Sequence, residues 1–201
     1  HELGAGYMAS GYALASGKTG VVFSGAPGPG ATNLVTPVAN AFADSIPLLV
    51  LTGQVDRRYM NRNILQYADN IALFNQFCKS SLQAVSAIEI PNLIATSLQI
   101  ASSNRPGPVQ LDIPQNIQAE LSNEYRKIEM AKLSNNPPSA NIIDQVINLI
   151  NESTRPIIIS GHGVIRSNGT DSLSECAQLL GAPVATSRSG IGSINSANEH
   201  S

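Results

Sequence analysis

The segment Gly25-Ala-Pro-Gly-Pro-Gly-Ala-Thr-Asn33 decides the fold, because a β-type run enters it and a helix-type run leaves it. Residues 19–23 are apolar, and residues 34–43 carry apolar side chains at helical spacing. Three glycines permit close backbone approaches that a Cβ would forbid, and two prolines stiffen the loop. The pattern predicts a rigid strand-to-helix turn, with the amides of residues 31–33 facing a ligand crevice. An ordinary glycine-rich connection is the alternative that the residues alone leave open.

The flanking sequence extends this turn into an α/β pattern. Residues 45–52 form an apolar run, which is typical of a strand buried on both faces of a parallel sheet. Strand, helix and strand within about thirty residues make a βαβ unit. Further strands are predicted at 80–85 and 108–113, with a helix at 88–102 between them. We therefore expect an α/β fold with a parallel sheet flanked by helices.

Residues 3–16 are predicted to form a helix that is dense in small side chains. Gly4, Gly6 and Gly11 lie inside it, and each costs about 1 kcal/mol relative to alanine, so close packing must compensate. A helix with so many small side chains can pack very close to another backbone. That backbone belongs either to its own domain or to a second subunit, and the sequence leaves both open.

The second half of the chain repeats the α/β pattern after a change in composition. Residues 119–138 are polar, lack periodicity and end in Asn-Asn-Pro-Pro, so they are predicted to be a linker. After them we expect a helix with apolar residues at 143, 146, 147 and 150, a buried strand at 157–159, a turn at 161–163, a helix at 173–180 and a strand at 183–186. The predicted domains are therefore 1–118 and a partial, Rossmann-like α/β domain at 139–201.

Composition and charge exclude several classes of function. The chain has 201 residues, 13% of them charged, with a net charge of −2, so no basic field attracts nucleic acid or an anionic membrane. No apolar stretch approaches the roughly 20 residues of a membrane span, and no signal-peptide pattern is present. Cys78 and Cys176 lack ligand-spaced partners, which favours packing thiols over a zinc site or disulfide. We expect a soluble, cytoplasmic protein.

A polar segment follows the second predicted strand and carries Arg57, Arg58 and Arg62. It is predicted to be a loop, because polar residues without periodicity separate two apolar runs. Its arginines are either solvated or grip an anionic group, and the sequence leaves both open.

Five fragments in this order resemble the pyrimidine-binding domain of thiamine-diphosphate enzymes, closest to the acetolactate synthase group. They are His1-Glu2 with the small-residue helix, Gly28-Pro29-Gly30-Ala31-Thr32-Asn33, Asp44-Ser45-Ile46-Pro47, Thr52-Gly53-Gln54-Val55, and Arg105-Pro106-Gly107-Pro108-Val109 with Leu111-Asp112-Ile113-Pro114. Residues 1–118 match closely, and residues from 139 onward are similar to the start of the family's middle domain. The resemblance implies a thiamine-diphosphate-binding fold without its first strand and helix, and a later domain bearing Gly-Asp-Gly.

The resemblance also implies a cofactor site. Glu2 matches the catalytic glutamate that hydrogen-bonds N1′ of the cofactor aminopyrimidine and favours the imino tautomer that deprotonates thiazolium C2. Pro29 and Asn33 match positions beside the aminopyrimidine, within a cofactor-binding set that includes Gly28 and Gly30. Gln66 matches a glutamine near the thiazolium and the substrate. A carboxyl shielded from water has a raised pKa and can share a proton with a weakly basic ring nitrogen. From the residues alone, a helix-start carboxylate is the alternative for Glu2.

The activity implied by the resemblance is that of a carboligase or decarboxylase of 2-oxo acids. Acetolactate synthesis from two pyruvates, a step of branched-chain amino acid biosynthesis, is the best match. The alternatives are another thiamine-diphosphate 2-oxo acid decarboxylase and a non-catalytic ligand-binding module. Leu65-Gln66-Tyr67 departs from the group's Phe-Gln-Glu, which leaves the substrate open.

Cofactors and partners follow from the same resemblance. Mg²⁺ is implied, with its ligands in the later domain and none in this chain. FAD is not supported, because Gly161-His162-Gly163 replaces a more glycine-rich turn. The expected partners are a small 2-oxo acid and copies of the same chain in a homodimer or homotetramer, with neither nucleic acid nor membrane. The 201 residues alone are expected to be inactive.

Overall fold

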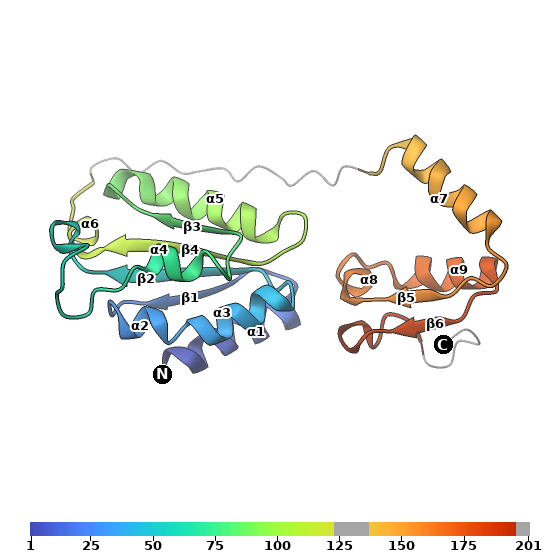
Figure 1. Ribbon diagram of the computed structural model, residues 1–201, viewed down its shortest axis with the longest axis horizontal. Helices are drawn as coiled ribbons and strands as arrows, with labels where there is room; N and C mark the ends of the chain where they lie inside the picture. Colours follow the sequence, from blue (N-terminus) through green and yellow to red (C-terminus); the bar gives the residue numbers. More distant parts are fainter. Residues whose placement is uncertain (123–136, 196–201) are drawn as a thin grey trace. The chain divides into compact units, whose positions relative to one another are not determined.

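The computed structural model describes residues 1–122 and 137–195 (Figure 1). The chain divides into two compact units, His1–Leu133 and Ser134–Ser201. Of the predicted linker 119–138, residues 123–136 lie outside the described residues. In the two described ranges, no helix combines the length and the apolar character that crossing a membrane requires.

The first unit is built on a four-stranded parallel sheet with the strand order β1-β2-β4-β3. Its strands are β1 (Gly20–Ser24), β2 (Leu48–Gln54), β3 (Ser80–Gln83) and β4 (Pro108–Pro114). In the central register, Thr52 lies opposite both Ser24 and Asp112. Strands β2 and β4 are buried along nearly their whole length, as expected for a parallel sheet covered on both faces. The helix-flanked parallel sheet predicted from the sequence is confirmed.

Helices cover this sheet unevenly. On one face lie α1 (Glu2–Ser16) and α3 (Val35–Ala43), with Val38 and Phe74 in the core beneath them (Figure 1). On the other face, α5 (Ile90–Ser102) packs over Leu111 and Ile113. Strand β1 pairs with β2 alone among the described residues, and its Val21 and Phe23 side chains are more than half exposed.

Several short elements fall in segments that carry no periodic signal. They are α2 (Pro29–Thr32), η1 (Arg57–Tyr59), α4 (Asn70–Phe74), η2 (Ala87–Glu89) and α6 (Gln115–Gln118). Helix α4 packs against β3 and β4, on the same face of the sheet as α3.

Helix α1 has two different faces. A Cβ on Gly6 would clash with the ring of Pro37, and a Cβ on Gly20 would clash with the Ala9 carbonyl, so one face packs closely within its own unit. The other face exposes the large side chains Tyr7, Met8, Tyr12 and Leu14. A Cβ on Gly4 or Gly11 would meet no atom within 4 Å. Close packing in its own domain thus accounts for Gly6 and leaves the other two glycines unexplained.

The second unit contains α7 (Ala140–Glu152), β5 (Ile158–Ser160), α8 (His162–Arg166), α9 (Thr170–Leu180), β6 (Val184–Thr186) and η3 (Arg188–Gly190). Strands β5 and β6 pair in parallel, with Ile158 opposite Val184. Leu173 and Ala177 of α9 pack with Val184 and Ile194 into a small core.

Two predictions for the second unit are wrong in the described residues. Ile157 and Ile159 are 67% and 80% exposed, so the strand is not buried on both faces. The reason is that the small core lies on one side of a two-stranded sheet. Residues 161–163 form more than a turn, because Gly161 caps helix α8, which begins at His162. Helix α7 forms where the sequence predicts it, and Ile143, Val146 and Ile147 on its apolar face are exposed.

The two cysteines differ in their surroundings. Cys78 is buried in the core, as the sequence predicts, and burial raises the pKa of its thiol to about 12. Cys176 is exposed, which corrects the prediction of a packing thiol. The physical reason is its place on α9, because Leu173 and Ala177 form the buried face of that helix.

Iodoacetamide at pH 8 is expected to alkylate Cys176 at least about 100-fold faster than Cys78, because only the thiolate reacts. Peptide mass spectrometry of the native full-length protein over a time course measures both rates. The urea-unfolded protein is the control, in which the two peptides should react alike. Comparable rates in the native protein would show that the Cys78 thiol is accessible and ionised.

Candidate functional site

The turn after β1 is shaped by glycine. Gly28 has φ 60° and ψ −106° and caps α2, whose first residue is Pro29, a favoured position for proline. A Cβ on Gly30 would lie 2.5 Å from Ser24 Oγ and 2.8 Å from the Ala26 methyl group. The chain therefore bends tightly against itself, as the sequence predicts for a rigid strand-to-helix turn.

The predicted crevice amides are only partly available. The amide of Thr32 donates to the Gly28 carbonyl, and the amide of Asn33 donates to the Pro29 carbonyl, both at 2.9 Å. The prediction that amides of residues 31–33 face a ligand is thus wrong for these two. Helix α2 begins at Pro29, earlier than the periodic run indicates. Carbonyl groups at the start of this helix accept the hydrogen bonds of the two amides.

Glu2 meets this turn from the start of α1. Asn33 Nδ2 donates a hydrogen bond of 3.2 Å to Glu2 Oε2, across 31 residues of sequence. Glu2 Oε1 lies 3.5 Å from the position that a Cβ on Gly30 would take. The Glu2 side chain remains 31% exposed. The structure therefore brings the carboxylate, the glycine turn and the Asn33 amide together.

The charge state of Glu2 differs from the prediction. A hydrogen bond from its own backbone amide and the one from Asn33 lower the pKa of Glu2. The raised pKa expected from shielding is therefore wrong for the chain described. The carboxyl group is partly open to water, so its ionised form is stabilised and presents acceptors to the turn.

Gln66 approaches the same turn from the loop between β2 and α4. A Cβ on Gly28 would lie 2.6 Å from the Gln66 carbonyl oxygen, so the two backbones touch. Gln66 has φ 65°, an uncommon conformation for a residue with a side chain. The Gln66 residue is exposed, as is Pro29. Glu2, Gly28, Pro29, Gly30, Asn33 and Gln66 thus gather around one turn, and their role toward a cofactor stays a prediction.

Comparison with known families bears on this arrangement. Residues 1–73 match the family model described as "Thiamine pyrophosphate enzyme, N-terminal TPP binding domain", and residues 143–201 match "Thiamine pyrophosphate enzyme, central domain". The chain belongs to the thiamine pyrophosphate enzymes. Thiamine pyrophosphate and thiamine diphosphate are the same compound. All six residues of the predicted site lie in the segment that matches the N-terminal domain of this family.

Curated relatives of this thiamine pyrophosphate enzyme are acetolactate synthases. The chain is 39% identical to the probable acetolactate synthase large subunit of Methanococcus aeolicus, over 97% of the chain and 33% of the relative. It is 38% identical to acetolactate synthase 1, chloroplastic, of Oryza sativa subsp. japonica, over 98% of the chain and 31% of the relative. It is 36% identical to the acetolactate synthase large subunit of Corynebacterium glutamicum, over 99% of the chain and 32% of the relative. The chain spans about a third of the length of these relatives.

One contact of the candidate site, made by Gly53, is not predicted from the sequence, although Gly53 lies in the family fragment Thr52-Gly53-Gln54-Val55. A Cβ on Gly53, near the end of β2, would clash with the Gly25 carbonyl, so the backbone of β2 packs directly against the turn. An isolated glycine inside an apolar strand is a known signal of close backbone approach, and it could have indicated this contact. Within residues 1–122 and 137–195, no cluster of three His, Cys, Asp or Glu residues could hold a metal ion.

Proposed function

We propose that this chain forms the pyrimidine-binding part of an acetolactate synthase, whose full-length form condenses two pyruvates to 2-acetolactate and CO₂. The observation that carries the proposal is the contact of the Asn33 amide with the Glu2 carboxylate beside Gly30. The names of the relatives support the choice of reaction. Another thiamine-diphosphate 2-oxo acid decarboxylase remains the alternative, because Leu65 and Tyr67 replace the aromatic and acidic neighbours typical of the group.

The residues present fit the aminopyrimidine of thiamine diphosphate. Other protein atoms occupy the space that a Cβ on Gly28 or Gly30 would take, so these glycines let the turn pack tightly beside Glu2. The partly exposed Glu2 carboxylate offers an acceptor beside the turn, and Asn33 fixes its orientation. When bound, the cofactor would supply a thiazolium ring, whose C2 acts as nucleophile and which then accepts electrons as a sink.

Within this site, Glu2 would hold the proton that it shares with a ring nitrogen. Hydrogen bonds from its own backbone amide and from Asn33 lower the pKa of Glu2 and so favour the ionised carboxylate before the ring arrives. A bound ring would exclude water from Glu2, and burial then raises the pKa of the carboxyl toward that of a weakly basic ring nitrogen. Proton transfer between closely matched groups is efficient, so this change in surroundings would prepare Glu2 for its role.

A second copy of the chain is proposed to pack on the exposed face of α1. Tyr7, Met8 and Tyr12 form an apolar surface on the helix that begins with Glu2, and Gly4 and Gly11 permit close approach. The names of two relatives call them large subunits, which supports an assembly. A homodimer or homotetramer, bound Mg²⁺, a cytoplasmic location and the inactivity of the 201 residues alone stay predictions, and FAD remains unsupported.

Calorimetry of the full-length protein tests the proposal against a non-catalytic module. With Mg²⁺ present, thiamine diphosphate is expected to bind at least about 10-fold more tightly than ADP, a difference of about 1.4 kcal/mol. Pyruvate should then give 2-acetolactate, detected by mass spectrometry. Preference for ADP would favour a nucleotide-binding module, and binding of neither ligand would favour an interaction scaffold.

A further inference from the structure

A layer of buried polar side chains lies under α4. At its centre is Asp112 of β4, which is fully buried. Its Oδ1 accepts hydrogen bonds from Thr52 Oγ1 at 2.6 Å and from Asn70 Nδ2 at 2.8 Å, and its Oδ2 accepts one from Gln83 Nε2 at 3.0 Å. Three elements besides β4 are therefore joined by a single carboxyl group.

The hydrogen-bond partners of the Asp112 carboxyl group all donate to it, so they favour its ionised form. Gln110 Nε2 donates to Thr52 Oγ1 at 2.7 Å, so the hydroxyl hydrogen of Thr52 is free to point at Asp112. Asn70 and Gln83 reach the carboxyl through NH₂ groups, which can only donate. Burial raises the pKa of Asp112, and these hydrogen bonds act in the opposite direction. No ion pair joins Asp112 to a cation in the part of the chain that is described.

Burying a carboxylate without a neighbouring cation costs folding free energy. The contacts of Asp112 therefore indicate which part of the structure it stabilises. Asn70 is the first residue of α4 and ends the loop 56–69 that carries Gln66. Beside it, Gln54 Nε2 donates to the Ala68 carbonyl at 2.7 Å. The exit of the loop is thereby fixed to the carboxyl ends of β2 and β4.

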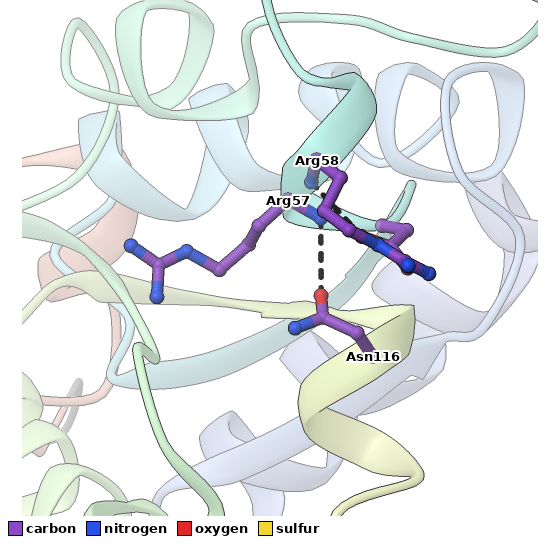
Figure 2. Close-up of polar contacts among 4 residues, drawn as sticks. Arg57, Arg58 and Asn116 are labelled. Carbon is purple, nitrogen blue, oxygen red and sulfur yellow. Dashed lines mark hydrogen bonds and ion pairs between the residues drawn. The ribbon is translucent and has the colours of Figure 1, made fainter.

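The entrance of the loop is fixed by separate contacts. The backbone amide of Arg57 donates to Asn116 Oδ1 at 3.0 Å, as Figure 2 shows, and Arg57 Nη1 donates to the Val85 carbonyl. The Arg58 guanidinium forms an ion pair of 2.6 Å with Asp56. These contacts let Arg57 hold the loop to Asn116 and Val85, whereas the Arg58 side chain is 76% exposed, in agreement with the solvated alternative.

We propose that Asp112 is a positioning residue that, through Asn70, holds the backbone of Gln66 against Gly28. Gln66 occupies a left-handed conformation that residues with a side chain rarely adopt, so it needs support from the residues that follow. Asn70 lies four residues beyond it and is hydrogen-bonded to Asp112. The consequence for cofactor binding rests on the proposed function, whereas the positioning itself does not.

Hydrogen–deuterium exchange of the full-length, cofactor-free protein tests the proposal. Asp112→Asn and Asn70→Ala are each expected to speed exchange in peptides covering 56–69 by at least about 10-fold, with peptides of α5 unchanged. Gln83→Met is the matched control, because it removes one hydrogen bond from the same carboxyl without touching the loop. It should change loop exchange by less than about 2-fold. If Asp112→Asn does not fold, Asn70→Ala decides, since it cuts the link and keeps the carboxylate.

Two results would overturn the positioning role. One is unchanged exchange in the loop of Asn70→Ala, and the other is an equal increase in every peptide, which a purely structural role predicts. Calorimetry with thiamine diphosphate and Mg²⁺ then measures the consequence: affinity should fall in Asp112→Asn and Asn70→Ala and persist in Gln83→Met. If the unmodified protein does not bind the cofactor while loop exchange responds as expected, the proposed function fails and the positioning role stands.

Discussion

Glu2→Gln in the full-length protein is expected to slow proton exchange at C2 of bound thiamine diphosphate by at least about 100-fold, the range of a lost acid–base group. The carboxamide has nearly the same shape, and its oxygen can still accept the hydrogen bond from Asn33. It cannot hold the proton that a carboxylate shares with a ring nitrogen. Deuterium exchange at C2, quenched in acid and followed by NMR, measures the rate.

His1 supplies the matched control for this experiment. It is adjacent to Glu2, its Nδ1 lies 4.0 Å from Glu2 Oε2, and its side chain is 66% exposed. His1→Gln should therefore change the exchange rate by less than about 3-fold, because no proton is expected to pass through it. Normal cofactor binding with an unchanged C2 exchange rate in Glu2→Gln would remove the basis for the proposed site.

Gly28→Ala is expected to lower stability and to weaken cofactor binding together. Gly28 has φ 60° and ψ −106°, a backbone conformation that residues with a side chain rarely adopt, and it costs an L-residue about 1 to 3 kcal/mol. In addition, the new Cβ would lie 2.6 Å from the Gln66 carbonyl and force the loop away from the turn. We expect a loss of thiamine diphosphate affinity of about 10-fold or more, or about 1.4 kcal/mol. Urea unfolding and calorimetry of the full-length protein measure the two effects.

Gly17→Ala is the control for a positive φ without a steric contact. Gly17 caps α1 with φ 68°, and a Cβ there would meet no atom within 4 Å. Its substitution should cost about 1 to 2 kcal/mol from backbone conformation and leave cofactor affinity unchanged. Equal losses of stability and affinity in both variants would mean that the contact between Gly28 and Gln66 is unimportant.

The sheet could be predicted from the sequence because its central strands are buried on both faces. Such strands appear as continuous apolar runs, and β2 shows this most clearly. Helix α2 could not be predicted, because four residues inside a glycine- and proline-rich segment carry no period. In β4, Gln110 and Asp112 alternate with apolar residues, a pattern that also fits a strand with one wet face. The tertiary structure alone shows that α4 covers this polar face.

The predicted site depended on the resemblance more than on the residues. Glu2 and Asn33 are 31 residues apart, and no local pattern links them. From its position alone, Glu2 is a carboxylate at the start of a helix, and its lowered pKa fits that simple description. The layer around Asp112 was missed for a related reason: hydrogen bonds between distant side chains leave no periodic signal in the sequence.

Strand β1 lies at the edge of the sheet, and this position affects how the purified protein behaves in solution. Among the described residues, β1 pairs on one side only, so the peptide N–H and C=O groups of its other side can template the addition of another chain. Beside that edge, Val21 and Phe23 offer an apolar surface. Purified in isolation, these 201 residues would therefore be prone to aggregate strand against strand. Truncation for biophysical work should be accompanied by a charged or proline substitution on this edge.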